Sequence, residues 1–294
     1  VSSCNTAKKA KESEAAKKAA AAKNEKPQPK KGDIQPYDKV ITKESKTDDG
    51  LFKVHKIDDK YLFEIPDSLL EREMLMVTRI AKNTSNNRSF GGQKANTQML
   101  RWQKKDKKIV LRVVSHAIVA ADSLPIHEAV VNSNFEPVLH TFPIQAIGKD
   151  STSTVIDVTD LFDKDVKALG LPDYRRKQYK VTRLESDKSF IESVKSYPQN
   201  IEARHVKTYA AGDPPSNSST GTISVEINNS MILLPEVPMK KRFYDERVGW
   251  FTAGQVDYGL DNQKSETVRF LRRWRLEVKD GRRYSHTTLS LRCK

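Results

Sequence analysis

The sequence is poor in cysteine, glycine and long hydrophobic runs, and each shortage excludes a class of protein. Its two cysteines, Cys4 and Cys293, cannot form a disulfide framework, a CxxC redox pair or a zinc knuckle. Twelve glycines without a period exclude a collagen-like chain. Apolar runs of only a few residues exclude a transmembrane helix within this sequence. The 294 residues, 37% of them hydrophobic, indicate a globular body with polar ends.

The positive charge of the chain is concentrated at its two ends. The net charge is +14, of which residues 1–36 contribute +5 from nine lysines and four acids, and residues 269–294 contribute +7 from nine basic and two acidic residues. The 232 residues between them carry 34 basic and 32 acidic side chains, so the body is close to neutral. The lysine-rich N-terminal stretch has no aromatic residue to stack on a base. We therefore expect no nucleic-acid partner.

The first four residues, Val1-Ser2-Ser3-Cys4, resemble the end of a bacterial lipoprotein signal, in which the cysteine becomes the acylated first residue of the mature protein. Acylation at Cys4 would anchor the chain to a membrane, since each buried methylene contributes ~0.8 kcal/mol. The Lys/Ala/Pro-rich residues that follow have too little apolar surface to fold, which predicts a flexible or partly helical tether. We expect an outer-membrane lipoprotein of the cell envelope; the alternative is an incidental cysteine in a disordered end.

The body shows the alternation of apolar and polar residues that is typical of strands. Residues 50–65 predict a β-hairpin that turns at Asp58-Asp59-Lys60, and Asn228-Asn229 predicts a second tight turn between two strands. Short helices are expected near Pro125 and over 159–169. The expected fold class is α+β, rich in β-structure, with mostly antiparallel strands. The predicted division is a tether over 1–36, a small β-hairpin domain over 37–81, a polar loop or linker over 82–98, a β-rich domain over 99–278 and a tail over 279–294.

No string in the sequence forms a recognisable active site. His127-Glu128 begins like the HExxH motif of zinc proteases, but Val131 stands where the second histidine is needed, so the metal could not be held. The other histidines have no ligand spacing, and P-loop, GxGxxG and GxSxG motifs are absent. We predict no catalytic, cofactor-binding or metal-binding residue in this chain. A hydrolase that uses scattered carboxylates is a weaker alternative.

Residues 242–251, RFYDERVGWF, form the densest local signature. One interpretation is a strand whose Trp250 and Phe251 serve the core, with an arginine paired to the acids and Gly249 placed where a side chain would clash. The other is a docking surface for another domain, because Trp, Tyr and Arg anchor interfaces. The residues expected to take part in interdomain docking are Arg242, Tyr244, Arg247, Trp250 and Phe251.

Several strings resemble, in family order, the two N-terminal domains of unknown function of bacterial zinc-dependent metalloproteases that continue into a met-zincin domain. The strings are PY at 36–37, VIT at 40–42, GLFKVHKIDDKYLFEIPDSLLEREML at 50–75, VIDVTDLF at 155–162, RFYDERVGWF at 242–251 and FLRRWRLE at 270–277. The resemblance covers roughly 36–278 and departs from the family pattern near Val278. It implies a zinc-binding HExxHxxGxxH motif downstream, to which no residue of this chain corresponds. We expect the tail to be a truncated or frameshifted end.

The resemblance implies a non-catalytic N-terminal region that supports, masks or docks the met-zincin domain of a secreted or lipid-anchored metalloprotease. Zinc is then expected only in that missing catalytic domain, and the partners are that domain, a membrane through Cys4 and a polypeptide substrate. The alternative is a free-standing envelope module that binds polypeptide or glycan.

Overall fold

A computed structural model describes residues 34–87, 90–216, 218–261, 264–273, 275–276 and 291–292. The predictions for Cys4, for the tether up to residue 33 and for most of the tail lie outside these residues. Within them the fold is β-rich α+β with antiparallel sheets and a few short helices, as the sequence predicts.

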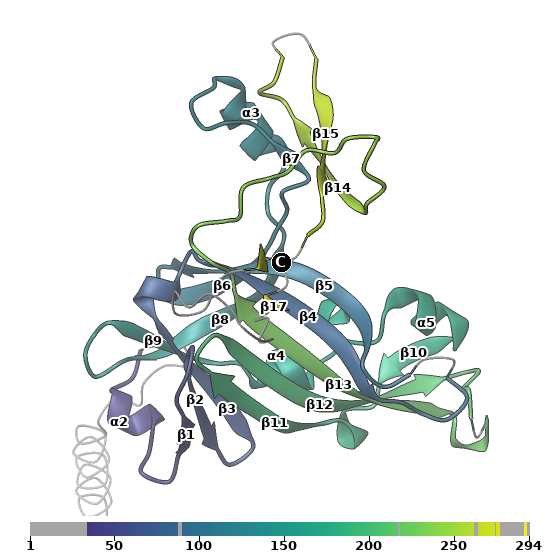
Figure 1. The fold of residues 1–294 in the computed structure, drawn as a ribbon. Coiled ribbons are helices and arrows are strands. Elements are labelled where there is room, and N and C mark those ends of the chain that lie inside the picture. Colours follow the sequence, from purple (N-terminus) through teal and green to yellow (C-terminus); the bar gives the residue numbers. More distant parts are fainter. Residues whose placement is uncertain are drawn as a thin grey trace, which may run out of the picture.

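The strands account for most of the regular structure (Figure 1). In the first half of the chain they are β1 (Lys46–Asp48), β2 (Lys53–Ile57), β3 (Lys60–Pro66), β4 (Glu73–Lys82), β5 (Gln93–Lys105), β6 (Lys108–Val114), β7 (Ile118–Val119) and β8 (Val138–Ile147). In the second half they are β9 (Ser153–Asp157), β10 (Val181–Leu184), β11 (Phe190–Tyr197), β12 (Asn200–Ala211), β13 (Thr222–Leu233), β14 (Thr252–Asp257), β15 (Glu266–Leu271), β16 (Arg275–Leu276) and β17 (Leu291–Arg292).

The helices are short and lie between strands. The α-helices are α2 (Tyr37–Val40), α3 (Ile126–Ser133), α4 (Thr159–Asp163) and α5 (Asp173–Gln178). The 3-10 helices are η1 (Asp67–Leu69), η2 (Lys167–Leu169), η3 (Ser186–Lys188) and η4 (Ser218–Thr220). Among the described residues, no helix is long and apolar enough to cross a bilayer.

Twelve strands form one sheet, called the main sheet below, in the order β1-β2-β3-β9-β8-β6-β5-β4-β13-β12-β10, with β11 also paired to β12. The sheet curls until its two ends meet, because the backbone N–H of Leu51 donates to the carbonyl of Tyr197 (2.8 Å) and the hydroxyl of Ser196 donates to the carbonyl of Phe52 (2.7 Å). Gly50 permits this approach, since a Cβ there would lie 2.5 Å from Ser196 Oγ.

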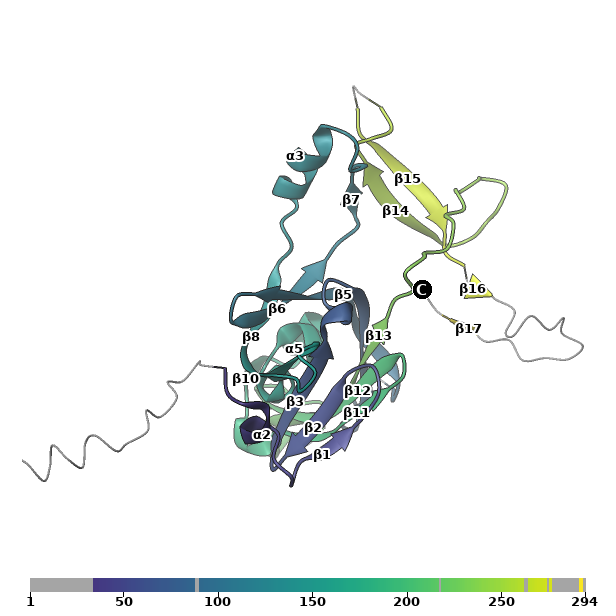
Figure 2. The same ribbon diagram turned by 90° about the vertical axis from the view of Figure 1, so that its left-hand side faces the viewer.

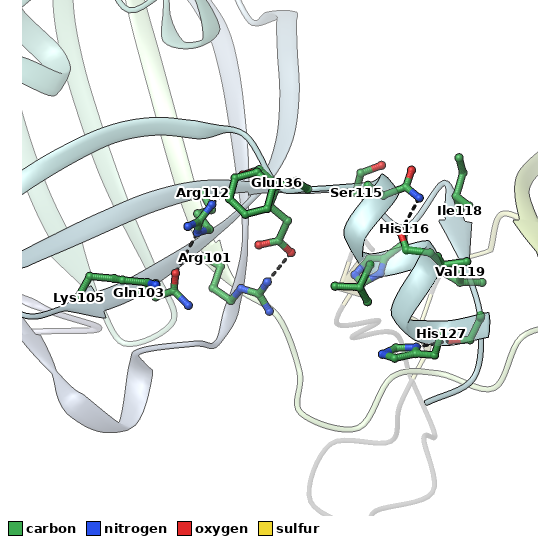
Figure 3. A pocket seen from close by; sticks show the side chains of 15 residues that line it. Arg101, Gln103, Lys105, Arg112, Ser115, His116, Ile118, Val119, His127 and Glu136 are labelled. Atoms are coloured by element: carbon green, nitrogen blue, oxygen red, sulfur yellow. Dashed lines mark hydrogen bonds and ion pairs between the residues drawn. The ribbon is translucent and has the colours of Figure 1, made fainter. Parts of the chain in front are cut away.

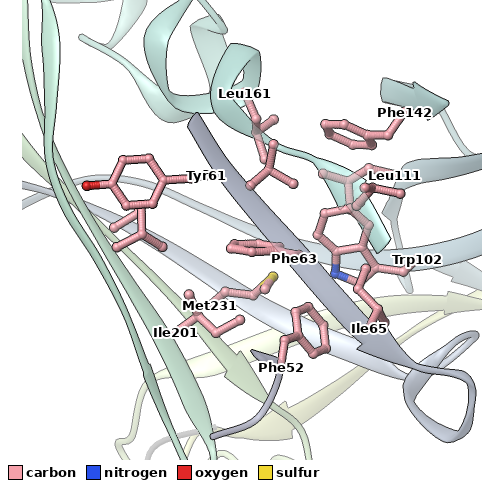
Figure 4. Packing of buried hydrophobic residues seen from close by; sticks show 14 of the residues in the cluster. Phe52, Tyr61, Phe63, Ile65, Trp102, Leu111, Phe142, Leu161, Ile201 and Met231 are labelled. Carbon is pink, nitrogen blue, oxygen red and sulfur yellow. The ribbon is translucent and has the colours of Figure 1, made fainter. Parts of the chain in front are cut away.

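The core fills the inside of the curl and is built around aromatic side chains (Figure 4). Trp102 on β5 contacts Phe52 and Phe63 with ring centroids 6.1 and 6.3 Å away, and Phe142 on β8 at 5.6 Å. All four rings are buried. Helix α4 closes this core with Leu161 and Phe162. Edge-to-face aromatic packing of this kind adds to the free energy gained by burying apolar area.

The segments 37–81 and 99–278 are parts of the same sheet and core. Strand β4 pairs with β5 on one side and with β13 on the other, and β3 pairs with β9. The expected loop over 82–98 is irregular at first, but its last residues form the beginning of β5, which starts at Gln93. Its polar residues misled the prediction because this part of the strand is only partly covered.

The expected turn at Asn228-Asn229 is wrong. Strand β13 runs without interruption through both residues, which pair with Arg204 and Ala203 of β12. Asn229 is buried and uses its side chain to bond Thr78 and His205. Tertiary hydrogen bonds therefore override the local turn preference of asparagine.

A small module projects from the main sheet (Figures 1 and 2). This projecting module comprises residues 115–137, inserted between β6 and β8, and residues 234–273, which follow β13. Its sheet has the order β15-β14-β7, and α3 lies beside β7. The contacts to the main sheet include an ion pair between His116 Nε2 and Glu73 Oε1 at 3.0 Å.

Candidate functional site

Residues 242–244 of the RFYDERVGWF segment lie on the projecting module as an additional run of backbone beside β15. The N–H of Leu271 donates to the carbonyl of Arg242 (2.8 Å), and the N–H of Tyr244 donates to that of Arg269 (2.9 Å). Phe243 and Phe270 form an isolated antiparallel bridge between these two bonds. The segment is therefore anchored through its first three residues.

The large side chains of this segment face solvent. Phe251 is 82% exposed, Phe243 65% and Trp250 56%. The interpretation of Trp250 and Phe251 as core residues is therefore wrong, and so is the expected clash at Gly249, because a Cβ there would meet nothing within 4 Å. The expected pairing of an arginine with an acid is present, since Arg247 Nη2 lies 2.6 Å from Asp245 Oδ2. Hydrogen bonds from Arg247 lower the pKa of Asp245 to about 2.

The register brings cationic and apolar side chains together on the outer face of the module. Residues directly opposite in an antiparallel pair share a face. Arg242 therefore lies beside Leu271, and Tyr244 lies beside Arg269. Phe270 lies on the opposite face of the strand, which is turned toward the main sheet. At the end of β15, the N–H of Arg272 donates to the carbonyl of Phe251 (2.9 Å), and the indole N–H of Trp250 donates to the carbonyl of Arg272.

Two adjoining groups of residues, together called the aromatic–arginine surface below, lie at this end of β15: one on the outer face beside β15, and one just beyond β15, where hydrogen bonds join Trp250 and Phe251 to the backbone of Arg272. The surface consists of Arg242, Tyr244, Arg247, Trp250, Phe251, Arg269, Leu271 and Arg272. The first five are the residues expected from the sequence to dock another domain: Arg242 and Tyr244 lie beside β15, Trp250 and Phe251 lie beside Arg272, and Arg247 pairs with Asp245 in the stretch of chain between them. The last three were missed because they lie on β15 or directly after it, far along the chain, and only the register with residues 242–244 and the hydrogen bonds to 250–251 bring them to this segment.

A cavity of about 600 Å³ separates the projecting module from the main sheet. Leu75 and Met99 of the main sheet line one side, and Leu234 and Phe270 line the other. Its polar groups are already paired: Arg72 Nη2 donates to the carbonyl of Leu234 (3.0 Å), and Lys241 Nζ donates to Gln255 Oε1 (2.5 Å). The cavity therefore has the size of a ligand site without a polar group free to select a ligand.

A second cavity of about 450 Å³ lies between β5, β6 and α3 (Figure 3). Arg101 pairs with Glu136 across it, and the Arg112 guanidinium lies 4.8 Å from the centre of the Phe135 ring. His127 Nδ1 lies 3.1 Å from the carbonyl of Ala120, so this histidine ties α3 to the preceding loop. Val131, at the position where HExxH needs its second histidine, is 52% exposed.

One buried cluster has the residue types of a hydrolytic triad but not its order. In a triad, histidine lies between the nucleophile and the acid. Here the Glu64 carboxylate lies between them, because Ser153 Oγ donates to Oε1 (2.7 Å) and His55 Nε2 lies 3.0 Å from Oε2. Tyr37 also donates to Oε2 (2.9 Å), and Thr47 Oγ1 lies 2.8 Å from His55 Nδ1. Each side-chain polar atom of the cluster is hydrogen-bonded, so the cluster joins α2 to the four strands β1, β2, β3 and β9.

Burial and hydrogen bonding act in opposite directions on the Glu64 carboxyl. Burial raises its pKa, but hydrogen bonds from His55, Ser153 and Tyr37 outweigh burial and lower the pKa to about 2. The carboxylate is therefore ionised at neutral pH and only accepts hydrogen bonds, which places a proton on His55 Nε2. Burial and the neighbouring carboxylate raise the pKa of Tyr37.

A second buried cluster lies beneath α4. Lys207 Nζ donates to the carbonyls of Asp163 (2.6 Å) and Lys164 (2.8 Å), which end α4, and burial lowers the pKa of Lys207 to about 8. Burial lowers the pKa of His205 to about 3, so this histidine is neutral beside Asn229. Lys207 binds carbonyls that the helix leaves without intrahelical partners, which is a structural role.

Among the described residues, no three His, Cys, Asp or Glu side chains lie close enough together to hold a metal ion. The described histidines lie on different elements, His127 among them on α3. The aromatic–arginine surface is therefore the candidate functional site.

Two protein families match parts of this chain, and both are domains of unknown function. Residues 92–279 match the family described as Domain of unknown function (DUF5117), and residues 34–83 match Domain of unknown function (DUF5118). No curated protein and no solved structure matches the chain.

Proposed function

The chain belongs to the DUF5117 family, and from this premise we propose that it is the non-catalytic N-terminal region of a zinc-dependent metalloprotease, which docks and supports a met-zincin domain. The observation that carries the proposal is the exposure of Trp250 and Phe251 on a module that stands away from the core. Large apolar side chains clustered on a surface mark sites of protein–protein contact. The family resemblance of the sequence supplies the identity of the partner.

The shape of the molecule supports a docking role. The largest core cluster, built around Trp102, Phe52, Phe63 and Phe142, lies within the main sheet, so the projecting module is not needed to cover it. The module instead carries the aromatic–arginine surface, whose Trp, Tyr and Arg residues are the types that dominate binding energy at interfaces. A met-zincin domain that covers Trp250 and Phe251 would remove both from water.

Binding between this chain and the met-zincin domain of a family protein, supplied as a separate polypeptide, tests the proposal by calorimetry. We expect the double variant Trp250→Ala/Phe251→Ala to bind at least about tenfold more weakly, because each anchor contributes on the order of 1–2 kcal/mol. Phe190→Ala is the matched control, since Phe190 is 51% exposed on β11 of the main sheet. No binding, or equal weakening by the control, would contradict the proposal.

Envelope anchoring through Cys4 is part of the same proposal and rests on the sequence Val1-Ser2-Ser3-Cys4. Its test is membrane fractionation of cells that express the chain with its export signal. Cys4→Ser should move the protein to the soluble fraction, and unchanged partitioning would refute the anchor.

A further inference from the structure

The aromatic–arginine surface carries more positive than negative charge. Arg242, Arg269 and Arg272 are exposed, and none of them forms an ion pair with another described residue. The exposed Lys240 lies next to them in the chain and has no such partner among the described positions either. Asp245 is already occupied by Arg247, which leaves Glu246 as the one acid of the segment that no described residue pairs. The surface and the adjoining Lys240 therefore present four cations whose charge is uncompensated within the part of the chain described.

Each arginine lies beside an apolar or aromatic group. The register places Arg242 next to Leu271, and Arg269 next to Tyr244. The backbone of Arg272 accepts a hydrogen bond from the indole N–H of Trp250 and donates one to the carbonyl of Phe251, so Arg272 lies next to both residues. A guanidinium is planar, is weakly hydrated and binds a carboxylate through two parallel hydrogen bonds. The repeated unit is thus a carboxylate-binding group with an apolar contact next to it.

We propose that the aromatic–arginine surface binds an acidic protein face, on which carboxylates surround apolar side chains that receive Trp250 and Phe251. This inference rests on the proposed function and names the chemistry of the partner: the docking face of the met-zincin domain carries Asp and Glu. Attraction between the two faces speeds their encounter and selects their orientation.

A protein face accounts for the surface better than a phosphate-rich partner. The exposed Glu246 belongs to the same segment as Arg242, and the ion pair with Asp245 keeps Arg247 from binding other anions. A nucleic acid or an anionic membrane presents only negative charge and would be repelled by Glu246. A protein face can place one basic group opposite Glu246 and carboxylates opposite Arg242, Arg269 and Arg272.

Fluorescence anisotropy with labelled peptides tests the chemistry directly. The probes are three peptides of about twelve residues with Leu and Trp at the same positions. The remaining positions are Glu in the first peptide, Gln in the second and Lys in the third. We expect the Glu peptide to bind roughly tenfold more tightly than the Gln peptide, with no binding by the Lys peptide. Raising NaCl from about 0.05 M to about 0.5 M should weaken binding of the Glu peptide, because salt screens exposed charges.

Charge variants assign the effect to this surface. Arg242→Gln/Arg272→Gln should lose most of the preference for the Glu peptide. The control Arg183→Gln/Lys195→Gln removes the same charge from exposed positions on β10 and β11 and should bind like the wild type. Each variant is first shown to keep the wild-type urea midpoint, so that loss of binding reports the surface and not unfolding.

Equal binding of the Glu and Lys peptides, or of both double variants, would overturn the inference. Binding of phosphatidylglycerol vesicles but not of the Glu peptide would also overturn it and assign the surface to a membrane. If the met-zincin domain binds through Trp250 and Phe251 but Arg242→Gln/Arg272→Gln and salt change nothing, docking stands and the acidic partner is wrong. If the Glu peptide binds and the met-zincin domain does not, the acidic preference stands and the proposed function is wrong.

Discussion

Glu64 shows how a single buried carboxylate connects distant parts of this chain. It is 3% exposed and accepts hydrogen bonds from Tyr37, His55 and Ser153, which lie on α2, β2 and β9. A buried charge costs free energy unless it is fully hydrogen-bonded, so the three donors must stay in place together. The sequence gives no sign of this cluster, because its members are up to 116 positions apart in the chain.

The pKa of Glu64 predicts an acid-dependent loss of stability. Its pKa is about 2 in the folded protein against an ordinary value of 4.5, so the unfolded chain binds more protons between these values. The contribution of the ionised group, on the order of 3 kcal/mol, is complete above about pH 5 and disappears as the pH falls through about 2. We expect Glu64→Gln to be destabilised by a similar amount at pH 7.

Urea unfolding of the wild type and Glu64→Gln, repeated at several pH values, measures this contribution. The difference in free energy of unfolding between the two proteins should shrink steadily as the pH falls from about 5 to about 2. Because both proteins share all other carboxylates, those groups cancel in the difference. A difference that stays constant down to the lowest pH would show that Glu64 is not held ionised.

At the scale of single elements, exposure separates the aromatic residues of the core from those of the projecting module. Trp102 is fully buried, whereas Trp250 is 56% and Phe251 82% exposed. Trp102→Ala should therefore cost about 3–5 kcal/mol of the free energy of unfolding, and Phe251→Ala less than about 0.5 kcal/mol. Chemical denaturation followed by circular dichroism gives both values. A large loss for Phe251→Ala would mean that the side chain is packed and not free to dock a partner.

The two ends of the main sheet meet at Gly50, where there is no room for a side chain. A Cβ would lie 2.7 Å from the backbone nitrogen of Tyr197 as well as close to Ser196. We expect Gly50→Ala to cost about 1–3 kcal/mol and to speed amide exchange at Leu51, whose N–H crosses between the ends. Gly249→Ala is the control, because that site is open and should change stability by less than about 0.5 kcal/mol. Equal effects of the two substitutions would contradict the observed closure of the sheet.

The sequence predicts the elements of this fold better than their partners. Alternation places β2, β3, β4 and β6 within a few residues, because a half-covered strand repeats every two residues whatever its neighbours are. It fails at Asn228-Asn229, where hydrogen bonds to Thr78 of β4 and His205 of β12 keep the strand continuous, and at Gln93, where a polar, partly covered residue pairs with Ile80 of β4. For the candidate site, the residue types of 242–251 identify the segment, but only the register with β15 adds Arg269, Leu271 and Arg272.

At the scale of the whole molecule, the two family segments fold as one unit. Phe52 and Phe63 lie in residues 34–83, and their rings contact Trp102 of residues 92–279. Strand β4 of the first segment lies between β5 and β13 of the second. The largest core cluster is therefore built from both segments and cannot form in either one alone.

Cooperative unfolding follows from this shared core. We expect Phe63→Ala, which lies in the first segment, to lower the stability of β12 and β13 in the second segment by the same amount as that of β2 and β3. Native-state amide exchange resolves the two regions. Continued protection of β12 and β13 while residues 34–83 exchange freely would show that the segments are independent domains.

The docking role itself is tested most directly by hydrogen–deuterium exchange of the chain, alone and saturated with the met-zincin domain of a family protein. We expect new protection in residues 242–251 and 266–272, with exchange in β10 and β11 unchanged. Protection confined to the main sheet, or none anywhere, would contradict it.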